Sequence, residues 1–182
     1  MKHRPPTIPA DHRDAPDPRT GQDGDVPIPE FIRALRHHVG HDPLWLTGVS
    51  AVVRDHSGHI LLTRRADTGQ WAVVSGVLEP GEEPARAVVR EISEETGIVA
   101  EVLRLTSVDV TPMITYPNGD QTQYLDVCFA ARHLDGDPHP ADDENTDVAW
   151  FGVDELPENL AETSRLRIAK ALRDDPAAWF RR

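Results

Sequence analysis

The sequence predicts a single α/β domain, and three observations support this fold class. Strand-like runs rich in β-branched residues are mixed with helical patterns along the chain. Two of the helical patterns are substantial, as expected for helices that cover a sheet. The 182 residues are enough for one domain with a full hydrophobic core.

The first 28 residues differ in composition from the rest of the chain. They hold six prolines and many charges but almost no large apolar side chains. Such a segment cannot bury enough surface to offset the entropy of ordering it. We therefore expect a flexible tail over residues 1–28 and a single domain over residues 29–182. A partner-binding arm is the alternative function of the tail.

A short helix and a β-hairpin are expected next. Apolar residues recur at helical spacing over residues 31–39, and Gly40 suits the end of this helix. Residues 44–54 and 59–65 are apolar and rich in β-branched side chains, and a turn-forming Asp-His-Ser-Gly run separates them. This pattern predicts a hairpin, which a short strand over residues 71–74 follows.

The second half of the chain predicts the longest helix, further strands and a C-terminal helix. Pro84 suits the first turn of the longest helix, and Gly97 suits the position after its end. Leu125, Val127 and Phe129 alternate with less apolar neighbours, so one face of their strand is buried. The expected elements are a helix over 84–96, strands over 99–110, 123–132 and 147–153, and a helix over 158–173.

Net charge and cysteine content limit the classes of partner. The formal net charge of −12 argues against nucleic acid and anionic membranes, which repel an acidic surface. A small phosphorylated ligand remains compatible, because carboxylates can hold the cations that bind it. Cys128 is the only cysteine, and we interpret it as a buried thiol. No transmembrane run or signal peptide is visible, so we expect a cytoplasmic protein, and a homodimer stays open.

Three glutamates of the helix over residues 84–96 form the most informative pattern. Glu91, Glu94 and Glu95 stand at i, i+3 and i+4, on a face separate from the apolar stripe. Like charges this close repel, so the crowding stabilises nothing unless cations bind there. Magnesium prefers such oxygen ligands and shares them with phosphates. For the glutamates alone, a solvated acidic helix face is the alternative.

The full pattern over residues 76–98 is similar to the signature motif of the Nudix family. The resemblance extends more loosely over residues 44–156 through the order of strands. It implies an α/β/α sandwich with a mixed sheet between helices, and a loop–helix–loop that binds magnesium or manganese. The matching positions, all at the spacing of the motif, are Gly76, Glu82, Arg90, Glu91, Ile92, Glu94, Glu95, Gly97 and Ile98.

The resemblance also implies roles for residues of the motif. Glu94 and Glu95 resemble the principal metal ligands, and Glu91 resembles a further ligand or the general base. Arg90 resembles the arginine that orients this glutamate. Glu82 resembles the first glutamate of the motif, which often has a structural role.

Two residues outside the motif are also implied as site residues. Ser75 stands where relatives often supply a backbone carbonyl to metal, although many of them carry glycine there. A serine would be strained if this position required a positive φ. Glu144 lies in an acidic loop over residues 135–147, six residues before Trp150, a spacing that resembles a catalytic loop glutamate of the family. A solvated acidic loop is the alternative.

The implied activity is magnesium-dependent hydrolysis of the diphosphate bond in a nucleoside diphosphate linked to another group. ADP-ribose or a similar sugar nucleotide ranks with nucleoside triphosphates as expected substrate, ahead of dinucleoside polyphosphates. The markers disagree, because Tyr116 resembles the dinucleoside-polyphosphate subgroup and Pro112 lies near a position typical of ADP-ribose hydrolases. A nucleotide-sensing module without catalysis is the main alternative, and an intact motif argues against it.

Overall fold

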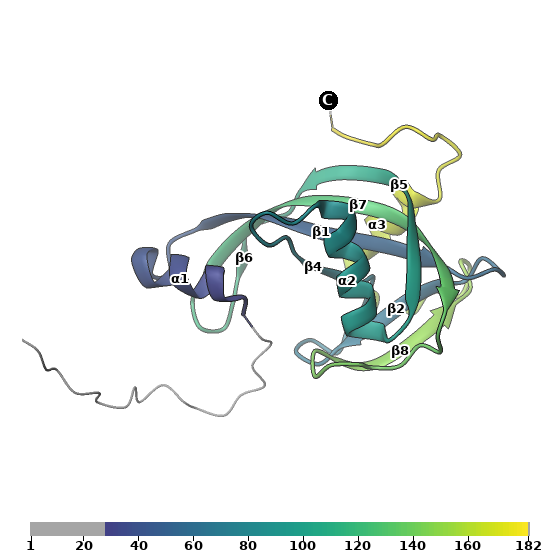
Figure 1. Ribbon diagram of the computed structural model, residues 1–182, viewed down its shortest axis with the longest axis horizontal. Helices are drawn as coiled ribbons and strands as arrows, with labels where there is room; N and C mark the ends of the chain where they lie inside the picture. Colours follow the sequence, from purple (N-terminus) through teal and green to yellow (C-terminus); the bar gives the residue numbers. More distant parts are fainter. Residues whose placement is uncertain (1–27, 182) are drawn as a thin grey trace, which may run out of the picture.

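The described residues, 28–181 of a computed structural model, form one mixed eight-stranded sheet with three helices (Figure 1). The tail expected over residues 1–28 lies outside the described residues except for Ile28. The strands are β1 (Leu44–Arg54), β2 (Ile60–Arg65), β3 (Trp71–Ala72), β4 (Ser75–Val77), β5 (Val99–Val110), β6 (Ile114–Thr115), β7 (Gln121–Asp135) and β8 (Asn145–Phe151).

The sheet is built around the parallel pair of β1 and β7. The main strand order is β3-β2-β1-β7-β5, and β7 pairs with β1 in parallel from Leu44↔Thr122 to Arg54↔Arg132. β5 is antiparallel to β7, and β8 is antiparallel to β2. β4 pairs with β1 through Val49↔Gly76, so the chain just before the longest helix is attached to the centre of the sheet.

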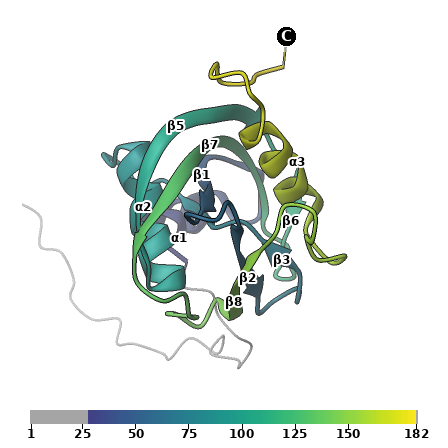
Figure 2. The same ribbon diagram turned by 90° about the vertical axis from the view of Figure 1, so that its right-hand side faces the viewer.

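Helices cover both faces of this sheet (Figure 2). α2 (Pro84–Thr96) packs on one face and α3 (Glu162–Ala171) on the other, while α1 (Glu30–Val39) contacts the start of β7, where Arg36 donates to the Gln121 carbonyl at 2.7 Å. The predicted α/β/α sandwich is therefore confirmed. Each face has its own apolar core: Val49, Ala51, Val88, Ile92 and Ile98 lie on the α2 side, and Val52, Ile60, Leu62, Cys128 and Ile168 lie on the α3 side.

The boundaries of α2 agree with the sequence prediction because both ends carry local signals. Pro84 occupies the first turn of α2, where backbone N–H groups have no partner within the helix. The N–H that proline lacks therefore costs no hydrogen bond there. Gly97 adopts a left-handed conformation with φ 69°, and its N–H donates to the carbonyl of Ser93. Val88 and Ile92 are fully buried, so the apolar stripe faces the sheet.

Several expected elements differ from the prediction in extent or pairing; the strand expected over 123–132 is the longer β7, and the strand expected over 147–153 lies two residues earlier, as β8. β1 and β2 share a single register pair, Arg54↔Ile60, and β4 pairs with β1 at Gly48–Ser50 instead. The strand expected over residues 71–74 is only the two-residue β3. The helix expected from residue 158 begins at Glu162, because Asn159 and Ala161 hydrogen-bond to the backbone of Trp71 instead.

Cys128 is fully buried on the α3 side of the sheet, as the sequence predicts. Burial raises the pKa of its thiol. Within residues 28–181, every helix is too short or too polar to cross a lipid bilayer.

Candidate active site

Gly76 and Glu91 meet where β4 lies against α2. A Cβ atom placed on Gly76 would lie 2.0 Å from Cδ and 2.1 Å from Oε1 of Glu91. Only a glycine therefore leaves room for the Glu91 carboxyl group over the backbone of β4. Ser75 lies in the same strand, where it pairs with Ser50 in extended backbone that any residue can adopt.

Glu95 is buried and joins three strands to α2. Its side chain accepts hydrogen bonds from Nδ2 of Asn145 (3.0 Å) and from the backbone N–H of Ser75 (3.3 Å). The hydroxyl group of Thr63 makes a longer contact of 3.5 Å. Sequence reasoning missed Asn145 and Thr63, although Thr63 is a polar residue that ends the apolar run of β2.

Arg90 connects three carboxylates around the motif. Its Nε atom donates to Oε1 of Glu82 at 3.0 Å, and one terminal nitrogen lies 3.0 Å from Oε1 of Glu91 and 2.9 Å from Oε2 of Glu94. The hydrogen bonds from Arg90 lower the pKa of Glu82. Glu94 is the most exposed of the three helix glutamates, so Glu91 and Glu95 form the inner part of the cluster.

Burial disfavours the ionised forms of the two inner carboxylates, although Arg90 partly offsets this effect at Glu91. Burial raises the pKa of Glu91 to about 7, with further contributions from Glu94 and Glu144. Burial raises the pKa of Glu95 to about 8, and Glu91 and Glu144 add to this effect. Several negative charges therefore act on the same small volume, and a positive charge placed there would stabilise the ionised forms.

The structure brings Glu144 from its distant loop to this cluster. The loop between β7 and β8 is attached to the turn after β2, because the N–H of Ala66 donates to the Glu144 carbonyl at 2.9 Å. Asp142 accepts a hydrogen bond from the backbone N–H of Glu144 at 3.0 Å. Burial and then Asp142 raise the pKa of the half-buried Glu144. Glu144 is thus partly buried and held in place through its backbone carbonyl.

Arg64 and Arg65 occupy different environments. Arg65 pairs with Asp67 at 2.8 Å, and the charges of Glu95 and Glu144 help to raise its pKa. Arg64 is exposed and donates to the Gly69 carbonyl at 3.3 Å. Of these two arginines, Arg65 is therefore the one that lies near the carboxylate cluster.

The donor atoms fit a hard divalent cation. Across residues 28–181, no three Asp, Glu, His or Cys side chains are gathered closely enough to hold a metal ion by themselves. Magnesium, however, commonly takes one or two carboxylates and completes its shell with water and substrate phosphates. Glu91 and Glu95 offer only oxygen atoms, and the charge of Glu144 acts on both of them. This open set suits such an ion.

Comparison with known proteins agrees with this constellation. The family model described as NUDIX domain matches residues 45–173. A MutT-like protein from Streptomyces ambofaciens is 37% identical over 130 residues, which cover 71% of this chain and 79% of that protein. The chain therefore belongs to the Nudix hydrolase family of enzymes. Members of this family generally use a divalent metal and act on small nucleotides.

Other relatives differ in length and substrate. The NAD-capped RNA hydrolase NudC from Pseudomonas aeruginosa (strain LESB58) is 32% identical over 110 residues, 59% of this chain but 37% of that protein. The chain thus spans little more than a third of that relative. A MutT NUDIX hydrolase structure from Burkholderia pseudomallei has 29% identity and a TM-score of 0.59, covering 70% of this chain and 98% of that one. A UDP-X diphosphatase structure has 28% identity and a TM-score of 0.58, and the match covers 78% of this chain and 68% of that one.

Proposed function

We propose that this protein hydrolyses the diphosphate bond of a nucleoside diphosphate linked to another group, and that magnesium or manganese is required. The observation that carries the proposal is the convergence of the Glu91 and Glu95 carboxylates beside Gly76, with charges that a cation would compensate. The similar UDP-X diphosphatase acts on a substrate of this class by its name. ADP-ribose or another sugar nucleotide ranks with nucleoside triphosphates, ahead of dinucleoside polyphosphates.

The cation would be held by Glu91, Glu94 and Glu95 together with the backbone carbonyl of Ser75. Of the glutamates, Glu91 and Glu95 lie deepest and Glu94 lies at the exposed rim. When bound, the cation neutralises part of the diphosphate charge and makes a water molecule more acidic. Arg90 positions Glu91 through its short ion pair with that carboxylate.

The reaction adds water across one phosphorus–oxygen bond of the diphosphate. Glu91 or Glu144 accepts the proton of the attacking water while its oxygen bonds to phosphorus. The bridging oxygen leaves with the second phosphoryl group, so the products are a nucleoside monophosphate and a phosphorylated second group. Arg65 would stabilise the negative charge that develops on the leaving oxygen.

A substrate panel tests this function. The full chain is incubated with ADP-ribose, a UDP-sugar, NAD, nucleoside triphosphates and a dinucleoside polyphosphate, in magnesium or in chelator, and nucleoside monophosphate is detected by chromatography. We expect release from at least one substrate in magnesium and none in chelator. Binding of a nucleotide without release from any substrate would favour the sensing alternative. The net charge of −12 supports a small nucleotide over an RNA chain as the substrate.

A further inference from the structure

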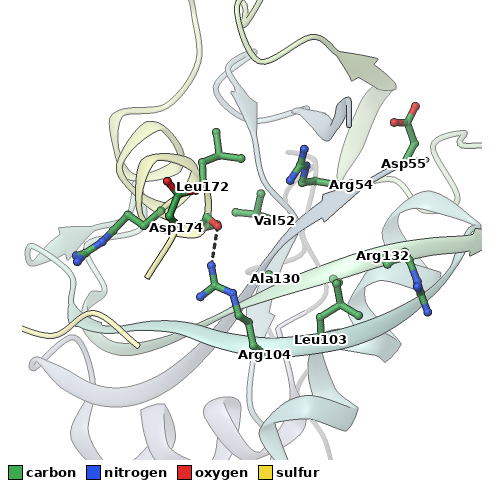
Figure 3. Close-up of a pocket in the computed structure, with 12 residues that line it drawn as sticks. Val52, Arg54, Asp55, Leu103, Arg104, Ala130, Arg132, Leu172 and Asp174 are labelled. Atoms are coloured by element: carbon green, nitrogen blue, oxygen red, sulfur yellow. Dashed lines mark hydrogen bonds between the residues drawn. The ribbon is translucent and has the colours of Figure 1, made fainter. Parts of the chain in front are cut away.

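A cavity outside the candidate active site is lined by four arginines (Figure 3). It has a volume of about 410 Å³ and lies between the sheet and the C-terminal end of α3. Two aspartates, Asp55 and Asp174, also line it. The chain as a whole has 19 basic against 31 acidic residues, so this cavity reverses the overall balance of charge. The arginines are Arg54, Arg104, Arg132 and Arg173.

The cavity is separate from the carboxylate cluster. Its lining includes Val52, which belongs to the apolar core on the α3 side, whereas Glu91 and Glu95 belong to α2 on the opposite face. Along β1, Arg54 lies five residues beyond Val49, the register partner of Gly76. At the rise of a β-strand, this separation is about 17 Å.

Arg54 and Arg132 are an unusual pair for adjacent strands. They are direct partners in the parallel register of β1 and β7, and both line the cavity. Like charges directly opposite one another on one face of a sheet are destabilising. Within the described chain, Arg54 forms no ion pair, and its Nε atom makes only a long contact of 3.4 Å to the Gly58 carbonyl. An anion between the two guanidinium groups would reverse the sign of this interaction.

The lining has four arginines against two aspartates, a formal excess of two positive charges, and Arg173 also pairs with Asp175 outside the lining at 3.4 Å. Asp55 already accepts hydrogen bonds from the backbone and the ring of His59. Arg132 pairs with Glu101, but both side chains are about half exposed, so solvent screens this pair and an anion can displace it at little loss. Arg104 donates a hydrogen bond to the carbonyl of Ala171, the last residue of α3, at 2.8 Å (dashed line in Figure 3).

We propose that this cavity binds a phosphorylated small molecule, whose phosphate group lies between Arg54 and Arg132. Guanidinium groups form bidentate hydrogen bonds with phosphate oxygens. Val52, Ala130 and Leu172 form apolar walls that would contact a non-polar part of the same molecule. The volume falls within the usual range for small-molecule sites, about 300–1,000 Å³.

The test uses phenyl phosphate as the probe and the full chain in excess chelator, which removes cations from the active site. Backbone amide resonances are followed by NMR during titration, with phenol and inorganic phosphate as reference compounds. We expect saturable shifts at residues that line the cavity, with phenyl phosphate binding more tightly than phosphate and phenol not binding. Shifts confined to residues around Gly76, or equal binding of phenol, would overturn the proposal.

Matched variants assign the binding to the two arginines. Arg54→Gln and Arg132→Gln, singly and together, should stay folded because they relieve a repulsion, and the double variant should weaken phenyl phosphate binding at least about tenfold. Arg165→Gln, an exposed arginine of α3 outside the cavity, carries the same change in net charge and should leave binding unchanged. An equal loss in Arg165→Gln, or full binding in the folded double variant, would contradict the assignment.

Discussion

At the scale of single residues, Gly76 determines where the Glu91 carboxyl group can lie. Alanine at this position would place a methyl group 2.0 Å from Cδ of Glu91 and displace the carboxylate. We therefore expect Gly76→Ala to lower kcat by at least about tenfold, because a small displacement of a reacting group is enough for such a loss. Circular dichroism should show a folded protein.

Gly48→Ala is the control for Gly76→Ala. Gly48 lies in the neighbouring strand β1, and a Cβ atom there would be 3.5 Å from the nearest atom, an ordinary contact with Tyr124. The control should keep most of the activity. Near-normal turnover of Gly76→Ala would mean that the position of Glu91 does not matter for the reaction.

Glu144 offers a second test among single residues. If it serves as ligand or base, Glu144→Gln should reduce the rate at least about tenfold, since general bases contribute roughly 10²–10⁴. Asp143→Asn is the matched control, because Asp143 is exposed in the same loop, whereas Asp142 binds the backbone N–H of Glu144. Steady-state kinetics with equal, mild effects in both variants would show that the loop contributes only surface charge.

At the scale of elements, two glutamates of α2 should make the folding stability of the metal-free protein depend on pH. Burial raises the pKa of Glu95 to about 8 and of Glu91 to about 7, above the ordinary value of 4.5. The folded state then keeps protons that the unfolded chain has released. Their contribution to stability is present in full below pH 4.5 and is lost as the pH rises to about 8. The melting temperature in chelator should therefore fall over this range.

The variant Glu95→Gln isolates this contribution because its side chain has no ionisable proton. Calorimetric melting curves of the variant should depend less on pH than those of the wild type between 4.5 and about 8. Magnesium should raise the wild-type melting temperature most at the upper end, where the carboxylates are ionised. Parallel pH dependences of the two proteins would contradict the raised pKa of Glu95.

α3 is held on the sheet by a buried ion pair. Asp126 of β7 accepts hydrogen bonds from Arg167 (2.9 Å) and from the hydroxyl group of Ser50 (3.1 Å). Arg167→Ala would leave a buried carboxylate without its partner and should destabilise the fold by about 3–5 kcal/mol in urea unfolding. Arg165→Ala, exposed on the same helix, should change stability by less than about 0.5 kcal/mol. Similar losses in both variants would rule out this role of the ion pair.

The same elements show what local sequence signals can and cannot predict. α2 was predictable at both ends because Pro84 and Gly97 act locally. The contacts of Asn145 and Thr63 with Glu95 were not, because they depend on the register of β8 against β2 and on the packing of α2 over both. A hydrophobic pattern indicates that a strand is buried but not which strand it pairs with.

At the scale of the whole molecule, the sheet separates two chemical environments. The carboxylate cluster lies where α2, β4 and the loop before β8 meet, while the α3 face carries the buried Cys128, the Asp126–Arg167 pair and the arginine-lined cavity. The sandwich was predictable from composition, element order and the Nudix motif. The parallel pairing of β1 with β7 was not, because it joins segments that are far apart in the chain.

We propose that the carboxylates beside Gly76 form a cation-dependent hydrolytic site. The most direct test is the rate of nucleoside monophosphate release as a function of magnesium concentration, in the wild type, Glu91→Gln and Glu95→Gln, with exposed Glu30→Gln as the control. We expect saturable dependence on magnesium in the wild type and control, no release in chelator, and losses of at least about a hundredfold in the folded Glu91 and Glu95 variants. Full turnover in chelator, or near-normal rates in both variants, would contradict this proposal.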